Sequence, residues 1–146
     1  MKTDRELIKN IRKLWLYSIF ELSHLEFQQK AWVEVSMPNV VSSFTEVACC
    51  YYDDLDLGSG YKNFILEGFI SDEEFEMVSA AHNLFSDYIS RTEKKSLSDA
   101  KVLLDPDWHR VVEAMFSAWQ ALKDLVNEDE QGYMDEIESK LKDVRN

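Results

Sequence analysis

Residues 43–61, SFTEVACCYYDDLDLGSGY, gather thiols, phenols and carboxylates within one short stretch. The side chains that could do chemistry there belong to Cys49, Cys50, Tyr51, Tyr52, Asp53, Asp54 and Asp56. Such a set is compatible with a metal site, with a catalytic site, or with a helix that ends in an acidic turn. The spacing of the cysteines, tyrosines and aspartates indicates which of these three interpretations the sequence supports.

The two cysteines are neighbours in the sequence. Adjacent cysteines can pair with each other only in a strained ring, so we expect no ordinary intrachain disulfide, which fits a reducing compartment. Zinc sites use spaced pairs such as Cys-x-x-Cys, and that spacing is absent. No histidine or basic residue lies beside the thiols to activate a thiolate. We therefore interpret Cys49 and Cys50 as small buried residues of a helix.

The three aspartates crowd the C-terminal end of a predicted helix, where the helix dipole favours cations. A protein that departs from a local rule sometimes does so for its function. The spacing does not fit a calcium loop, because the remaining ligands and the required glycine are missing. Two interpretations stay open. One is an acidic turn that is solvated or paired with the basic stripe Arg5, Lys9 and Arg12; the other is an acidic docking surface with Tyr51 or Tyr52 as aromatic anchors.

The segment DPDWH alternates Asp105, Asp107 and His109. A metal or catalytic role is one interpretation; the other is capping, because aspartate followed by proline is a typical helix start. His82 lies on an apolar helix face, which indicates a buried, hydrogen-bonded side chain. The sequence contains none of the motifs of metalloproteases, carboxylate-bridged di-iron proteins or serine-nucleophile enzymes. It also lacks phosphate-binding glycine loops and dinucleotide-binding fingerprints. We therefore expect no enzyme activity, no metal and no cofactor.

Apolar residues recur at helical spacing through almost the whole chain, and only 4 glycines and 2 prolines interrupt them. Residues 1–146 are therefore predicted to form one all-α domain, a compact bundle of six to seven helices. A capping box at Ser71 and Glu74 and a start at Asp105 mark two of the helices. Another helix is expected from about 39 to 54, and residues 99–104 are expected to form a short helical turn.

The charge of the chain is acidic and uneven. The formal net charge is −12, and all of it falls in residues 51–146. Such a field repels nucleic acid and anionic membranes and favours a basic partner, unless it serves solubility alone. No run approaches the roughly 20 apolar residues of a membrane span. The start MKTDRELIKN lacks the apolar segment of a signal peptide, so we expect a cytoplasmic protein.

Several stretches together resemble a group of small, helical, acidic bacterial proteins. These stretches are ELIKNIRKLWLYSIFELSHLEFQQKAWVE, SFTEV, YYDDL, GYKNFILEGFISDEE and DPDWHRVVEAMFSAWQAL. Some proteins of this group look like immunity proteins that accompany polymorphic or contact-dependent toxins. The resemblance implies a cytoplasmic binder that blocks a toxin and does no chemistry of its own. It transfers no functional residue, because such surfaces are specific for their partners.

The sequence thus predicts a non-enzymatic protein-binding protein that covers a basic site on a toxin with an acidic face. The residues assigned to this face, beside the anchors Tyr51 and Tyr52, are Asp53, Asp54, Asp56, Glu67, Asp72 and Glu73. One alternative is a helical domain that binds a metal or a small ligand, through residues 105–109 or 53–56. Another is a homodimer in which a surplus apolar face pairs with itself.

Overall fold

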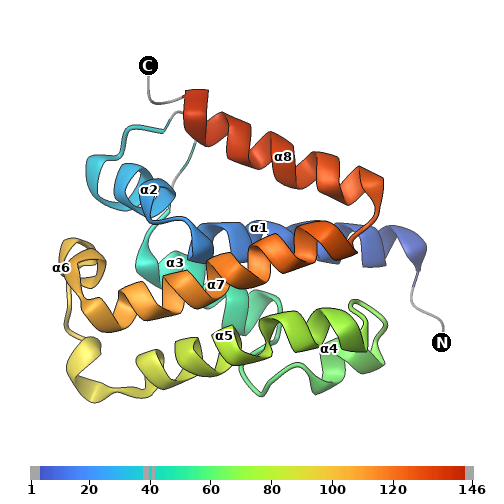
Figure 1. The fold of residues 1–146 in the computed structure, drawn as a ribbon. Helices are drawn as coiled ribbons and strands as arrows, with labels where there is room; N and C mark the ends of the chain where they lie inside the picture. Colours follow the sequence, from blue (N-terminus) through green and yellow to red (C-terminus); the bar gives the residue numbers. More distant parts are fainter. Residues whose placement is uncertain (1–3, 38–39, 41, 144–146) are drawn as a thin grey trace.

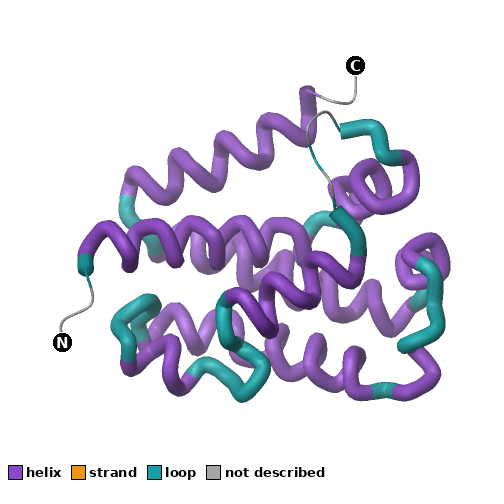
Figure 2. The backbone as a smooth tube through the Cα atoms, turned by 180° about the vertical axis from the view of Figure 1, so that it is seen from behind, coloured by secondary structure: helices purple, strands orange, loops and turns teal. Residues whose placement is uncertain are grey.

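The computed structural model describes residues 4–37, 40 and 42–143. Within these residues every regular element is helical and no strand is present, which confirms the predicted all-α class (Figure 2). The described part of the chain contains eight α-helices, so the expected six to seven is an undercount. The difference comes from residues 99–104, which form a separate α-helix because the Ser98 side chain accepts a hydrogen bond from the Lys101 amide and caps its start.

Four long helices form the frame of the molecule. They are α1 (Arg5–Ser23), α5 (Asp72–Ser90), α7 (Pro106–Leu125) and α8 (Glu128–Asp143). Four short α-helices connect and flank them: α2 (Leu25–Gln28), α3 (Phe44–Cys49), α4 (Lys62–Leu66) and α6 (Asp99–Leu104). Two wider, π-helical segments continue short helices, namely η1 (Gln29–Glu34) after α2 and η2 (Cys50–Asp54) after α3, and η3 (Thr92–Lys94) is a 3₁₀ turn.

Local capping sets several of these boundaries. The Ser71 hydroxyl and the Glu74 carboxylate form the predicted capping box at the start of α5. The Asp105 side chain accepts from the Asp107 amide at the start of α7, also as predicted. The helix expected from about 39 begins instead after Ser43, whose side chain accepts from a backbone amide of α3; residues 38, 39 and 41 lie outside the described residues.

Helix α7 lies at the centre of the arrangement. Both α5 and α1 pack along it, and α8 packs on α1 and α7 (Figure 1). The side chains between these helices form one continuous apolar core that includes all four tryptophans. The largest fully buried side chains belong to Trp15, Trp108, Trp119, Tyr51, Tyr88, Phe20, Phe27 and Phe85. Burying a large apolar side chain contributes about 1.5–3 kcal/mol, so this core holds the four long helices in place.

Among the helices of the described residues, none is both long enough and apolar enough to span a bilayer. Their apolar residues instead form stripes that face the shared core.

Candidate functional site

The six carboxylates predicted to face a partner lie on consecutive elements of the chain, from the end of η2 to the first turn of α5. Asp53 and Asp54 end η2, Asp56 follows in the loop to α4, Glu67 follows α4, and Asp72 and Glu73 open α5. All six residues are exposed. We call them the acidic surface. In Figure 1 the short helix α4 lies beside the first turns of α5, so the chain turns back on itself twice within this region.

A shallow hollow of about 280 Å³ brings two members of the acidic surface together. Asp56 and Glu67 lie on its edge with Asn63, and apolar side chains, including Phe64 and Phe69, form the rest of its lining. Asp56 has a left-handed backbone (φ 55°), a conformation that aspartate tolerates better than most residues. Glu73 lines a different pocket, and the structure brings Asp53, Asp54 and Asp72 into neither of these two pockets.

Sequence reasoning missed one residue of this region, Leu66. Its side chain is 73% exposed on α4, next to Glu67 in the sequence and one helical turn after Asn63. Its apolar character is visible in the sequence, but the helical spacing of α4 does not reveal which apolar residues reach solvent. An exposed leucine beside one of these carboxylates in the chain offers an apolar contact point to a partner.

The two predicted aromatic anchors have different environments. Tyr51 is 0% exposed, so the prediction that it presents its ring to a partner is wrong for this conformation. Tyr52 is half-buried, with its ring centroid 5.1 Å from that of Phe85, and its hydroxyl lies 3.1 Å from that of Ser86. Both tyrosines of η2 therefore pack against α5, and Tyr51 shares its buried face with Val47 and Leu55.

Tyr51 belongs to a chain of hydrogen bonds through the core. The Trp15 indole donates to the Tyr61 hydroxyl at 2.9 Å, which lies 2.8 Å from the Tyr51 hydroxyl, which in turn lies 2.8 Å from His82 Nδ1. Burial lowers the pKa of His82 and raises the pKa of Tyr51 well above its usual value. A neutral His82 that accepts from Tyr51 therefore satisfies every member, and the chain fixes η2 on α5.

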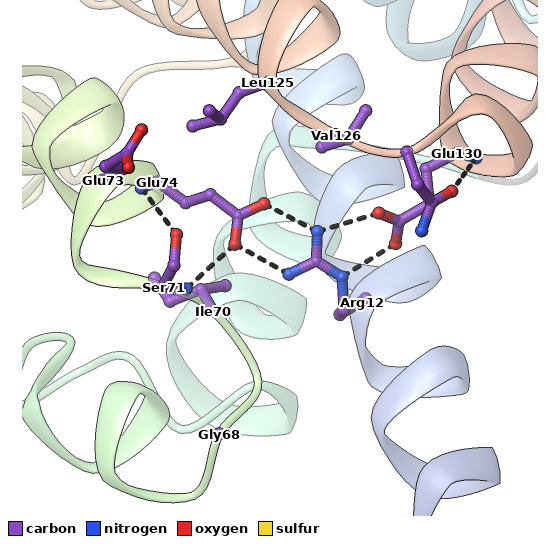
Figure 3. A pocket seen from close by; sticks show the side chains of 10 residues that line it. Arg12, Gly68, Ile70, Ser71, Glu73, Glu74, Leu125, Val126 and Glu130 are labelled. Carbon is purple, nitrogen blue, oxygen red and sulfur yellow. Dashed lines mark hydrogen bonds and ion pairs between the residues drawn. The ribbon is translucent and has the colours of Figure 1, made fainter.

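Arg12 does not pair with the acidic surface, so that expectation is wrong. Its guanidinium lies between Glu74 of α5 and Glu130 of α8 (Figure 3). The shortest contacts are 2.6 Å to Glu74 and 2.8 Å to Glu130, and Nη1 also donates to the Phe69 carbonyl at 2.8 Å. We call this group the Arg12 junction. Only 15% of the Arg12 side chain is exposed, against 7% for Glu74 and 10% for Glu130.

The Arg12 junction perturbs the ionisation of its members. Burial alone would raise the pKa of Glu74, but the hydrogen bonds from Arg12 and from the Ser71 amide hold it below its usual value. Burial likewise opposes the charge of Arg12, and the two carboxylates reverse that effect and raise its pKa. The junction thus carries one buried cation between two buried anions, and it joins α1, α5 and α8. Arg5 and Lys9, the rest of the expected stripe, line a groove against α8 instead.

The alternating residues of DPDWH are used for local structure. Besides capping α7, Asp105 accepts from Lys94 at 2.6 Å and from the Tyr88 hydroxyl at 3.0 Å. Asp107 pairs with Arg91 at 2.9 Å. The His109 ring lies 2.6 Å from the Leu103 carbonyl at the end of α6. This arrangement favours the capping interpretation, and nowhere in the described residues do three or more histidine, cysteine or acidic side chains form a group suited to a metal ion.

The two cysteines do not both lie in the core. Cys49 is exposed and Cys50 is half-buried, so the prediction of two buried small residues is wrong for Cys49. Burial, with the nearby carboxylates Glu21 and Asp54, raises the pKa of the Cys50 thiol to about 11. Cys50 is therefore protonated at neutral pH and is a poor nucleophile.

Glu21 is a half-buried carboxyl group near the end of α1. The Ser42 hydroxyl lies 3.3 Å from Glu21 Oε2 and accepts from the Trp32 indole at 3.0 Å. Among the residues that the structure describes, Glu21 forms no ion pair. Burial, with the nearby charge of Glu46, raises the pKa of Glu21 to about 7, although the bond from Ser42 opposes this.

No protein-family model matches the chain, and neither a curated protein nor a solved structure matches it.

Proposed function

We propose that this chain is a non-enzymatic binding protein whose acidic surface covers a basic site on a protein partner, and that the partner is a bacterial toxin domain that it neutralises in the cytoplasm. One observation carries the proposal. Five carboxylates of the acidic surface are exposed and form no ion pair with any described residue. They are Asp53, Asp54, Asp56, Asp72 and Glu73.

The proposed mechanism is steric and electrostatic. Exposed carboxylates that pair with no described cation attract a basic partner over several ångströms and accelerate association. Leu66, exposed between the segments that carry these charges, supplies apolar contact once the surfaces meet. A toxin that cuts nucleic acid needs a basic site for its substrate, and a bound acidic surface would block that site without any chemistry.

The first experiment identifies the partner. The tagged protein is expressed in its own cell with the neighbouring genes intact, and the proteins that co-purify are identified at low and at high salt. We expect a stoichiometric basic partner whose recovery falls as salt rises, because exposed charges are screened. A partner recovered equally at both salt concentrations would contradict the electrostatic mechanism.

Charge reversal then locates the surface. We expect Asp53→Lys with Asp54→Lys to weaken binding of that partner. The matched control is Glu113→Lys with Asp124→Lys, which changes the net charge by the same amount at two exposed positions on α7. If both double variants bind equally well, or both lose binding equally, the acidic surface is not the specific binding site.

The remaining alternatives make different predictions. A metal-binding domain predicts bound metal in protein purified without chelators, and a homodimer predicts twice the monomer mass by light scattering in solution. Either result, together with an empty co-purification, would replace the proposal of a neutralising binder. The charge of the acidic surface would then serve solubility.

A further inference from the structure

A second hollow lies away from the acidic surface and shares no lining residue with it. This pocket of about 240 Å³ opens between α3, the end of α5 and the segment that leads into α6. We call it the α3–α5 pocket. Its walls are mainly apolar side chains, namely Phe44, Ala48, Ile89 and Leu97. Apolar walls that face a water-filled space are unfavourable unless something covers them.

The two lysines at this pocket differ in whether they form ion pairs with described residues. Lys94 is held in place, because its ammonium lies 2.6 Å from Asp105 and 3.2 Å from Asp107. Lys95 is exposed at the pocket and forms no ion pair with any described residue. Asp99 is the one carboxylate in the lining. The pocket therefore offers a cation in a chain whose net charge is −12.

The size of the pocket restricts its ligand. Sites for drug-sized molecules start at about 300 Å³, and this pocket is smaller. A short apolar body fits such a space, and a single anionic group on that body would reach the mouth where the free cation lies. Ligand sites of this kind combine mostly apolar walls with one or two placed polar groups.

We propose that the α3–α5 pocket binds a small amphipathic carboxylate, with the apolar tail against Phe44, Ala48, Ile89 and Leu97 and the carboxylate at the ammonium of Lys95. The tail covers apolar walls that are otherwise hydrated, and the ion pair selects an anion over a neutral or cationic molecule of the same length. Binding here is independent of any protein partner at the acidic surface.

Octanoate is the probe, and octan-1-ol and octylamine are its matched neutral and cationic controls. Binding of each to the full chain is measured by titration calorimetry. We expect octanoate to bind about threefold more tightly than octan-1-ol, which is the scale of a solvent-exposed ion pair, and octylamine to bind most weakly. Equal affinities for the three probes would overturn the assignment of a carboxylate.

Two lysine variants test the role of the charge. Lys95→Met keeps an apolar stem and removes the ammonium, so it should remove the preference for octanoate over octan-1-ol and leave octan-1-ol binding unchanged. Lys101→Met removes the same charge from an exposed position of α6 that does not line the pocket, and it should keep the preference. The same result for both variants would show that net charge, and not Lys95, gives the preference.

Cys49 lines the pocket and reports its occupancy. In the Cys50→Ser variant Cys49 is the one remaining thiol of the chain, and its rate of alkylation by iodoacetamide can be followed alone. Octanoate should slow this rate at the concentrations at which calorimetry detects binding. Thr45→Trp, which fills the pocket from an exposed position on α3, should abolish binding of octanoate by calorimetry. Binding that persists in this variant, or that leaves the alkylation rate unchanged, would place the ligand elsewhere.

Discussion

Two groups of carboxylates in this molecule have opposite environments. Those of the Arg12 junction are buried and share one guanidinium between three long helices. Those of the acidic surface are exposed, and five of the six form no ion pair with a described residue. Each of these carboxylates counts the same in the formal net charge, but only the two of the Arg12 junction join helices through an ion pair between described residues. Carboxylates in this chain therefore either join helices or remain exposed on the surface, and composition alone does not tell these two roles apart.

The largest effect should follow from breaking the buried group. Arg12→Met leaves Glu74 and Glu130 buried without a cation, so we expect a loss of about 3–5 kcal/mol in the free energy of unfolding, measured by urea denaturation. The control Lys9→Met removes a cation from an exposed position of the same helix and should change stability by less than about 0.5 kcal/mol. Similar losses in the two variants would show that Arg12 acts only through net charge.

A third environment, that of the half-buried Glu21, sharpens the comparison through its pH dependence, because no described cation pairs with this carboxyl group. Its pKa is raised to about 7 from an ordinary value of 4.5, so the folded protein binds more protons than the unfolded chain between these values. Stability should therefore fall as pH rises from 4.5 to 7, by up to about 3 kcal/mol. The contribution of Glu74 to stability has the opposite pH dependence. The pKa of Glu74 is lowered from its ordinary value of 4.5, so its contribution is lost as the pH falls below 4.5.

The variant Glu21→Gln tests the Glu21 contribution directly. The amide carries no charge, so this variant should lose the decline between pH 4.5 and 7 and should be more stable than the parent chain at pH 8. Urea denaturation at a series of pH values measures both effects. An unchanged pH profile would mean that Glu21 is solvated in solution.

A smaller effect is expected at Asp105, a carboxylate that is paired near the surface. Asp105→Ala removes the cap of α7 and the partner of Lys94 and Tyr88, and should lower the free energy of unfolding by about 2 kcal/mol. Asp105→Asn keeps an acceptor for the cap and should lose less than half as much. Thermal melting of the two variants beside the parent chain measures the difference. Equal losses would mean that the ion pair, and not the cap, accounts for the effect.

The smallest effect on stability should come from the acidic surface. Asp53→Lys with Asp54→Lys exchanges carboxylates for cations at the C-terminal end of η2, where the dipole favours cations. We expect a change within about 0.5 kcal/mol and, if it is measurable, a gain. A clear loss of stability would show that these aspartates support the fold, and the contrast between the two groups would then fail.

The sequence predicts those features of the fold that depend on near neighbours. Ser71 and Glu74 form their capping box from three residues apart, and Asp105 caps the helix that Pro106 begins. The partners of Arg12 could not be predicted in this way, because Glu74 and Glu130 lie 62 and 118 residues away. Their meeting depends on how α1, α5 and α8 pack, and several packings bury the same apolar stripes.

The candidate site was predictable only in part, and for a similar reason. The exposure of Asp53, Asp54 and Asp56 follows from their charge and their position after a helix. The burial of Tyr51 agrees with its helical spacing from Val47 and Leu55, which are buried as well, so its assignment as an exposed anchor goes against the periodicity of its own helix. The partners of its hydroxyl, Tyr61 and His82, lie 10 and 31 residues away and depend on packing that the sequence does not give.

The Arg12 junction also bears on how such a protein can diverge. Replacing Arg12 leaves two buried carboxylates without a cation, and replacing either glutamate removes hydrogen bonds from a mostly buried guanidinium, so single mutations there pass through a less stable intermediate. Residues such as Asp53 or Asp72 have no described partner to lose, and each can change sign in one step. We therefore expect a lineage of these chains to keep Arg12 with its two glutamates and to vary freely at the acidic surface. A scaffold of this kind can change its partner without first having to change its fold.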